Sequence, residues 1–350
     1  MRRVRAIPNR DREQIDVRVL IDDGNRHTQM TGYGNLSRAI MLGLKMHTDA
    51  QLAVRNRVGD LPDWVKHREL LEEVPVEPHS KNFDVTLRVS PPNRRVADIS
   101  EGVPSVIYTQ NALGDLLPEW VDNLSGVKAV IVPGEFDARV FRRYFSNVHI
   151  CTQYVEEATF RPMATYRSEG AEEKSFIFVG SYSYRKGVDL MLNAFCKAFS
   201  NGEKVHLTLH CFSGLEKSGV NDLISRLRPI PENVRITVFN GSVTPPWMAR
   251  IYNQHDAVVS FSRGEGWCMP LHEGLLCGKP VLAPDSTAMG EHLPRDGVRR
   301  IAVEEREIAS IDEPFGSGMR NHYGFAGNTM WNVTEEDAIA ALRDVYENLD

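Results

Sequence analysis

The stretch SFSRGEGWCMPLHEGLLCGKPVLAPD, Ser260–Asp285, carries the clearest fold signal in this chain. The apolar run Ala257–Ser262 leads into it and predicts a strand that ends at a glycine-rich loop. Pro270 predicts the first turn of a helix, because the N–H that proline lacks is not needed there. Pro280–Ala283 predicts the next strand. Strand, loop, helix and strand in this order predict two parallel strands joined by a helix that covers one face of their sheet.

The same alternation of short β-branched runs and amphipathic stretches extends along almost the whole chain. In the first half the predicted strands are Val17–Asp22, Gln51–Val54, Val85–Val89, Val106–Thr109 and Val127–Val132. In the second half they are Phe176–Gly180, Val205–His210 and Val234–Phe239, followed by the two strands already named. The predicted helices include Leu36–Met46, Gly187–Phe199, Pro246–Gln254 and Pro270–Cys277. This pattern predicts an α/β fold of two Rossmann-like, doubly wound parallel sheets with an interdomain cleft.

A polar segment without hydrophobic periodicity, Arg161–Lys174, predicts the domain boundary. The chain has 350 residues, which is more than one compact core usually holds. We therefore expect an N-terminal domain over residues 1–165 and a C-terminal domain over residues 166–350. The last predicted helix, about 335–349, is a candidate to pack back on the N-terminal domain.

Composition and charge exclude several classes of protein. The hydrophobic share of 42% and the charged share of 25% are ordinary for a globular protein, and the formal net charge of −6 gives no general attraction to nucleic acid or anionic membranes. Five cysteines without a Cys-x-x-Cys pair argue against a disulfide framework and a structural zinc site. No apolar run reaches the roughly 18 residues that a bilayer span needs. A cytoplasmic location is the expectation.

The loop before the Pro270 helix has the features of an anion site. The backbone N–H groups of Trp267, Cys268 and Met269 would point out of a helix N-terminus, an arrangement that suits a diphosphate. Glu265 precedes this site and Glu273 lies about one turn inside the helix. A carboxylate can accept two hydrogen bonds from vicinal hydroxyls, which ribose and hexoses both offer. A capping or solvated carboxylate is the plainer interpretation of either glutamate taken alone.

The whole string resembles the signature of glycosyltransferase family 4, whose members are retaining enzymes with the GT-B fold. Glu265, Gly266, Met269–Leu271, Glu273, Gly278, Pro280 and Val281 match it, while Trp267 stands for a phenylalanine and Cys268 for a second glycine. The resemblance implies that Glu265 contacts hydroxyls of a donor sugar and that Glu273 holds the ribose. It also implies that the backbone from Gly266 to Pro270 lines the diphosphate. The Cys268 side chain either reshapes the sugar pocket or points away from it.

The segment FVGSYSYRKGVDL, Phe178–Leu190, resembles a second motif of the same family. Lys186 and Gly187 match its Lys-Gly pair, which implies that Lys186 neutralises the diphosphate as it leaves. Ser181, which the resemblance places among the donor-binding residues, stands where the family usually has an arginine. Arg185 is a candidate to replace it from another point on the loop, and a solvated Arg-Lys pair is the alternative.

Two segments of the first half complete the resemblance. Gly32, Tyr33 and Gly34 are similar to the glycine loop of the family's N-terminal domain, which approaches the donor phosphate and the acceptor. Gln110 and Asn111 stand where relatives carry a histidine or glutamate near the reacting sugar, and an amide is a poor general base. Asp115 is the nearby candidate on the acceptor side.

The function expected from this resemblance is that of a metal-independent retaining glycosyltransferase, with no cofactor and with a sugar nucleotide as co-substrate. It would transfer a hexose from a UDP- or GDP-sugar, bound by the C-terminal domain, to a hydroxyl acceptor bound by the N-terminal domain. The acceptor stays open among a saccharide, a lipid-linked sugar, a small molecule and a modified nucleic acid. The alternatives are a sugar-nucleotide epimerase or phosphorylase on the same fold, and a non-catalytic protein that binds sugar nucleotides.

Overall fold

The computed structural model describes residues 17–24, 26–29, 31–164, 172–211, 224–225, 230–308 and 326–349. The chain forms two compact units. The N-terminal unit comprises Met1–Thr109, Pro118–Val132 and Tyr144–Tyr154, and the C-terminal unit comprises Gln110–Leu117, Pro133–Arg143 and Val155–Asp350. The boundary predicted at residues 165 and 166 lies outside the described residues. Two short segments from the first half of the chain, 110–117 and 133–143, thus pack with the second half.

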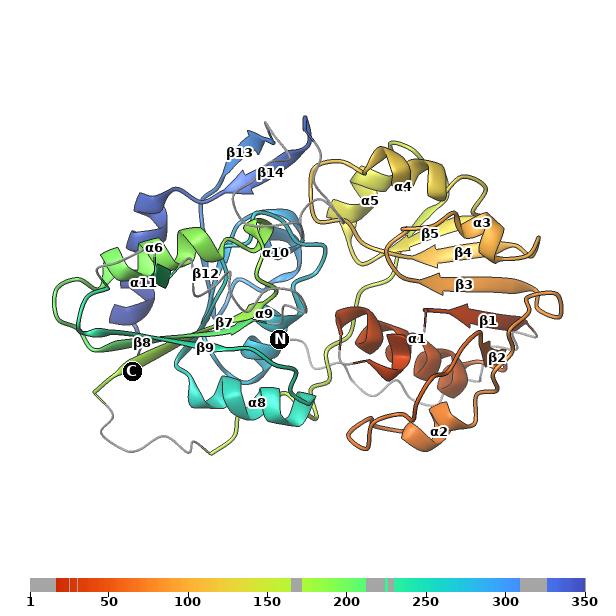
Figure 1. The fold of residues 1–350 in the computed structure, drawn as a ribbon, viewed down its shortest axis with the longest axis horizontal. Coiled ribbons are helices and arrows are strands. Elements are labelled where there is room, and N and C mark those ends of the chain that lie inside the picture. The colour runs from red at the N-terminus through yellow and green to blue at the C-terminus, as the bar shows by residue number, and fades with distance from the viewer. Residues whose placement is uncertain are drawn as a thin grey trace. The chain divides into compact units, whose positions relative to one another are not determined.

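The N-terminal unit is a six-stranded parallel sheet in the order β2-β1-β3-β4-β5-β6 (Figure 1). Its strands are β1 (Arg18–Asp22), β2 (Gln51–Val54), β3 (Val85–Val89), β4 (Ser105–Tyr108), β5 (Ala129–Val132) and β6 (Val148–Ile150). Its helices are η1 (Arg26–Thr28), α1 (Gly32–His47), α2 (Arg68–Glu72), α3 (Val96–Ile99) and α4 (Pro118–Asn123). The order reverses between β1 and β3. At such a switch point the loops diverge, and ligands of open α/β sheets bind in the crevice beyond the strand ends.

The C-terminal unit contains a second six-stranded parallel sheet, in the order β12-β11-β10-β7-β8-β9. Its strands are β7 (Lys174–Gly180), β8 (Val205–Cys211), β9 (Val234–Phe239), β10 (Ala257–Val259), β11 (Val281–Pro284) and β12 (Val298–Ile301). A separate antiparallel pair is formed by β13 (Glu304–Glu307) and β14 (Thr329–Asn332). The helices are α5 (Glu135–Phe141), η2 (Tyr184–Lys186), α6 (Val188–Ala198), α8 (Pro245–Gln254), α9 (Met269–Leu276), α10 (Thr287–His292) and α11 (Glu335–Glu347). The switch point of this sheet lies between β7 and β10.

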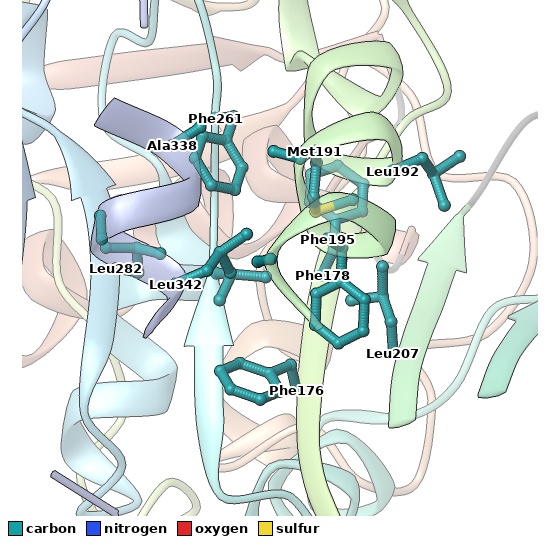
Figure 2. Packing of buried hydrophobic residues seen from close by; sticks show 14 of the residues in the cluster. Phe176, Phe178, Met191, Leu192, Phe195, Leu207, Phe261, Leu282, Ala338 and Leu342 are labelled. Atoms are coloured by element: carbon teal, nitrogen blue, oxygen red, sulfur yellow. The ribbon is translucent and has the colours of Figure 1, made fainter. Parts of the chain in front are cut away.

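The core of the C-terminal unit combines phenylalanines with aliphatic side chains (Figure 2). Phe176 of β7 lies with its ring centroid 5.4 Å from that of Phe195 on α6, in an edge-to-face arrangement. Leu342 of α11 is fully buried in the same cluster, as are Ala338 and Ala341. Each large side chain buried in this way stabilises the fold by about 1.5–3 kcal/mol. The buried face of α11 is therefore used inside its own unit, although the sequence made this helix a candidate to pack on the N-terminal domain.

The doubly wound parallel sheets predicted from the sequence are confirmed by both strand orders. The ten predicted strands occur within a few residues of their expected bounds. Helix α1 differs, because it begins at Gly32 and takes in the glycine loop predicted to precede it. Thr31 caps this helix, and its side-chain oxygen accepts a hydrogen bond from the Gly34 N–H at 3.0 Å.

Candidate active site

The loops after β7 and β10 meet at the switch point of the C-terminal sheet. Gly187 marks the contact: it has φ +68°, and a Cβ there would lie 2.0 Å from the Phe261 carbonyl oxygen. Only glycine fits both the backbone conformation and the available space. The Arg263 N–H donates to the Arg185 carbonyl oxygen at 2.6 Å and joins the two loops a second time. The residues at the tip of each loop are thereby held side by side.

Lys186, Arg185 and Glu265 converge at this contact. The Lys186 Nζ lies 2.5 Å from Glu265 Oε1, and a guanidinium nitrogen of Arg185 lies 3.2 Å from Glu265 Oε2. Both cationic side chains are only 13% exposed. They therefore do not form the solvated pair that was the alternative interpretation of the sequence. The Ser262 hydroxyl donates to Glu265 Oε1 at 2.7 Å. Three residues predicted separately from two motifs therefore form one cluster.

The charge state of Glu265 follows from these partners. Burial favours the neutral acid and acts to raise the pKa of Glu265, but Lys186 and Arg185 outweigh it. The pKa is lowered to about 2. Glu265 is thus ionised throughout the neutral range and can accept hydrogen bonds from hydroxyl groups.

The backbone of Glu265 is fixed by two residues that sequence reasoning missed. The Thr287 hydroxyl oxygen accepts the Glu265 N–H at 3.1 Å, and the Ala288 N–H donates to the Glu265 carbonyl at 3.2 Å. Thr287 has φ +53°, a left-handed conformation that is rare for a β-branched residue. Such strain is characteristic of functional sites, where the surrounding structure holds it in place. A buried, strained threonine leaves no recognisable pattern in the sequence.

Two glycines of the β10–α9 loop lie against the segment 110–112. A Cβ on Gly264 would lie 1.9 Å from the Ala112 carbonyl oxygen, and a Cβ on Gly266 would lie 2.7 Å from the Asn111 carbonyl oxygen and 2.8 Å from the Gln110 Cβ. These glycines allow the two backbones to touch. Gln110 is thereby placed directly beside the Glu265 loop.

The other two acceptor-side candidates have structural partners. Asn111 is buried, and its side-chain N–H groups donate to the carbonyl oxygens of Leu113 at 2.6 Å and Asp115 at 3.3 Å. The Asp115 carboxylate accepts the Leu116 N–H at 2.8 Å. Asn111 and Asp115 shape the turn that carries Gln110.

The loop residues Trp267 to Pro270 lead into α9 as predicted, with Met269 and Pro270 in its first turn. Cys268 precedes the helix with φ +65°. The family's glycine at this position is explained by that left-handed backbone, which glycine adopts without cost. Cys268 is buried among apolar residues, where burial raises the pKa of its thiol to about 12. Its side chain packs in an apolar cluster and also lies near Glu265, Lys186 and Arg185, whose charges act on the pKa of the thiol.

Glu273 lies on the buried side of α9, where its carboxylate accepts a hydrogen bond from the Tyr252 hydroxyl at 2.9 Å. Burial raises the pKa of Glu273 to about 7, and the bond from Tyr252 offsets this only in part. Glu273 thus differs from Glu265 in having no cation within ion-pair distance among the described residues. Its role at the ribose stays a prediction.

The remaining candidates lie at different points of the fold. Ser181 is exposed and directly follows β7. In the N-terminal unit, a Cβ on Gly34 would lie 2.3 Å from the Gln29 carbonyl oxygen. The close approach of the Gln29 backbone therefore explains why this residue is a glycine. Gly32 has open space around it. The Tyr33 hydroxyl lies 3.4 Å from the Thr109 hydroxyl oxygen.

Neither a metal site nor a membrane span is found in the described part of the chain. No group of three or more His, Cys, Asp or Glu side chains there is placed to hold a metal ion. None of the helices in these ranges has the length and apolar character to cross a bilayer.

Residues 173–313 match the protein family described as Glycosyl transferases group 1. This segment belongs to that family. The matched residues contain the loops after β7 and β10, and so the whole Lys186, Arg185 and Glu265 cluster.

Individual proteins similar to the chain extend the comparison beyond the group 1 segment. The serotype-specific mannosyltransferase WbdA of Escherichia coli is 24% identical over 176 residues, which are 50% of this chain and 21% of WbdA. The match thus spans about a fifth of that relative. Sucrose-phosphate synthase from Thermosynechococcus elongatus is similar in structure, with a TM-score of 0.66, 13% identity, and coverage of 95% of this chain and 90% of the other.

Anabaena HepE, solved in complex with UDP-glucose, gives a TM-score of 0.56 at 15% identity and covers 80% of this chain and 83% of its own. At such identities the likeness is one of fold. This likeness and the two strand orders together show a GT-B fold of two Rossmann-like domains. The group 1 segment lies in the second of them.

Proposed function

We propose that this chain is a retaining glycosyltransferase that transfers a hexose from a UDP- or GDP-sugar to a hydroxyl acceptor without a metal ion. The observation that carries the proposal is the cluster of Lys186, Arg185 and Glu265 at the switch point of the group 1 segment. Support for a hexose donor comes from the names of two similar proteins, a mannosyltransferase and a protein solved with UDP-glucose.

In the proposed reaction the bond between the anomeric carbon and the diphosphate oxygen breaks. A bond to the acceptor oxygen forms on the same face of the sugar. The acceptor proton passes to the leaving diphosphate oxygen, so that atoms and charges balance. Lys186 and Arg185 stabilise the negative charge that grows on the diphosphate, and Glu265 accepts hydrogen bonds from sugar hydroxyls. Glu265 also keeps the two cations ordered before the donor arrives.

The first test is a thermal-shift panel of UDP- and GDP-sugars with the full chain. A ligand that binds the native state at one hundred times its Kd stabilises it by about 2.7 kcal/mol. We expect one sugar nucleotide to raise Tm, and EDTA to leave the shift unchanged. The Glu265→Gln variant should lower the shift with the sugar nucleotide toward that with the free nucleoside diphosphate, because its proposed contact is to the sugar.

The second test follows the anomeric proton of the product by NMR with the donor found in the panel. Retention of the donor's anomeric configuration supports the proposed chemistry, and inversion contradicts it. Free epimer, or a requirement for phosphate in place of an acceptor, would instead identify an epimerase or a phosphorylase. A Tm shift without turnover on saccharide, lipid-linked, small-molecule or nucleic-acid acceptors would identify a binding protein.

A further inference from the structure

A pocket of about 400 Å³ lies at the switch point of the N-terminal sheet. Its lining comes from the ends of three adjacent strands and the loops that follow them: Asp22, Gly24 and Arg26 after β1, Arg55 and Asn56 after β2, and Arg88, Pro91, Asn93, Arg94 and Ile99 in and after β3. All of these residues belong to one unit. The position is the one at which open α/β sheets bind ligands.

The charge of this pocket is strongly positive. Four arginines line it, and Asp22 is the one carboxylate among the described lining residues. Asp22 is buried and its Oδ2 lies 2.9 Å from a terminal nitrogen of Arg88 and 3.3 Å from the Nε of Arg55. A single carboxylate therefore faces a set of guanidinium groups that outnumber it.

Two of the four arginines, Arg55 and Arg88, have terminal nitrogens that are held by other residues. Arg55 is part of the framework, because its terminal nitrogens donate to the carbonyl oxygens of Pro78 at 2.7 Å and Ile99 at 2.9 Å. Arg88 and Arg55 each keep a buried Nε without a hydrogen-bond partner. Burial lowers the pKa of Arg88, and the like charges of Arg26 and Arg94 act in the same direction. An anion between these three side chains would relieve that repulsion.

The wall formed by the β1–α1 loop is held by a buried polar network. The Asp23 carboxylate accepts hydrogen bonds from the His27 N–H at 2.7 Å and the Ser37 hydroxyl at 2.6 Å. Arg38 donates to the His27 carbonyl oxygen at 2.6 Å. Buried networks of this kind restrict a loop to one conformation. This network fixes the positions of Asp23, His27 and Ser37 beside the arginine pocket.

We propose that this pocket binds a phosphate ester. Guanidinium groups hold phosphate through paired, charge-assisted hydrogen bonds, and the surplus of cations over carboxylate suits a group with two negative charges. The volume is within the range of small-molecule sites, which leaves room for the group that carries the phosphate. If the proposed transferase function holds, on which this step rests, the ester is the acceptor. Its source is then either a soluble sugar phosphate or a lipid-linked diphosphate.

The binding test uses the full chain with glucose 6-phosphate and farnesyl diphosphate as probes for the two sources. Saturating UDP and GDP are present to occupy the group 1 segment. Calorimetry compares the wild type with Arg94→Gln and Arg26→Gln, which spare the buried Arg88–Asp22 pair. The matched control is Arg95→Gln, the neighbouring exposed arginine, which contacts Asp98 at 4.0 Å and is not among the lining residues. Each pocket variant should weaken binding of one probe about tenfold or more, and the control should not.

Three results would overturn the proposal. The pocket variants could bind both probes as tightly as the wild type, or the wild type could bind neither. Methyl glucuronide, which carries a carboxylate, could bind as tightly as the better phosphate probe. The loss could also follow Lys186→Gln and not Arg94→Gln, which would place the probe in the C-terminal unit.

Failure of this proposal is separable from failure of the proposed function. Donor binding and slow donor hydrolysis depend on the group 1 segment, so they should be unchanged in Arg94→Gln. Transfer to a phosphorylated acceptor should fall about tenfold or more in the same variant. A chain that binds the probes but never turns over a donor would retain the phosphate site and lose the transferase.

Discussion

Glu265 and Lys186 were predicted from two separate motifs, and neither motif indicates that they form an ion pair. The family resemblance implies that each residue contacts part of the donor, whereas in the structure the two residues form an ion pair with each other. The reason is electrostatic. A carboxylate as buried as Glu265 is costly without cations close by, and the loop after β7 supplies two.

The Lys186→Ala variant tests how this pair functions. Charge on the leaving diphosphate grows toward the transition state, so kcat should fall about a hundredfold or more while the donor KM changes less. Steady-state kinetics with the donor found by the thermal-shift panel measures the split. Arg185→Ala is the comparison, since Arg185 contacts the other oxygen of Glu265. A mutant in which only KM rises would show that Lys186 acts on the ground state.

Glu273 should give nucleotide binding a pH dependence. Its pKa is raised to about 7 by burial, and hydrogen bonds from ribose hydroxyls favour the ionised form. Affinity for the free nucleoside diphosphate should therefore rise as pH increases through about 7. Below that pH, binding should release a proton from Glu273. Calorimetry in buffers of different ionisation heat detects that proton. The Glu273→Gln variant should bind with no such dependence, and a wild type that shows none would remove Glu273 from the ribose.

The same shift predicts how Glu273 affects stability. An acid whose folded pKa is raised is more favourable when protonated, so its contribution is full below the unfolded value of 4.5 and is lost as pH rises toward about 7. Glu265 has the opposite sign, because its folded pKa is lowered to about 2. Its contribution is full above 4.5 and is lost as pH falls toward 2. Chemical denaturation of Glu273→Gln should therefore lack the decline between pH 4.5 and 7.

The cysteines should differ in reactivity. Cys211 and Cys268 are buried, and burial raises the pKa of each thiol to about 12, so little thiolate forms at pH 8. Cys151 is exposed. Alkylation of the native chain followed by mass spectrometry should label Cys151 first and leave the two buried thiols unmodified until denaturant is added. Early labelling of Cys268 would contradict the burial of its side chain.

Among the elements, the strands that sequence could identify are those rich in apolar or β-branched residues, either in a continuous run or in alternation. Those buried on both faces, such as β7 and β11, have continuous apolar runs. The strands β12, β13 and β14 were missed, because VRRI and EERE lack any apolar period and TMWN is too short to show one. Helix α10 was missed for a related reason, since its six residues include a glycine and no clear repeat. Because α10 was not predicted, the two hydrogen bonds that Thr287 and Ala288 make to the Glu265 backbone were not predictable either.

Thr287→Ala tests the contribution of α10 to the site. Removing the hydroxyl leaves the buried Glu265 N–H without its acceptor, which should cost about 1–3 kcal/mol of unfolding free energy. Thr287→Ser is the matched control, because it keeps the hydroxyl. Urea denaturation of both variants compares them. Equal stability of Thr287→Ala and the wild type would mean that the bond is not maintained in solution.

For the whole molecule, the sequence predicted two Rossmann-like domains, but nothing in it indicated that the segments 110–117 and 133–143 pack in the C-terminal unit. Residues 110–112 follow a strand of the N-terminal sheet and still lie against Gly264 and Gly266. The sequence of residues 110–112 does not indicate with which unit they pack. The only sequence feature related to this contact is that residues 264 and 266 are glycines, which leave room for the 110–112 backbone.

This arrangement revises what a fragment of the chain should do. The sequence predicts that a fragment starting near Glu172 binds UDP or GDP alone. Such a fragment lacks 110–117 and 133–143, which pack in the C-terminal unit, and also the core residue Phe160 of that unit. It therefore exposes the Gly264–Gly266 loop. We expect nucleotide binding about tenfold or more weaker than in the full chain, measured by calorimetry. Equal affinity would show that these segments do not shape the nucleotide site.

The arginine pocket of the N-terminal sheet also has a kinetic consequence. A chain with a formal net charge of −6 repels anions at long range, yet four guanidinium groups gather in one concavity. Field lines are focused in such a hollow, so an incoming anion is guided to it and its association rate is raised above that of a neutral analogue. Dissolved salt screens this guidance over about 10 Å at 0.1 M ionic strength. Binding of an anion to this pocket should therefore be fastest in dilute buffer and slow steadily as salt is added.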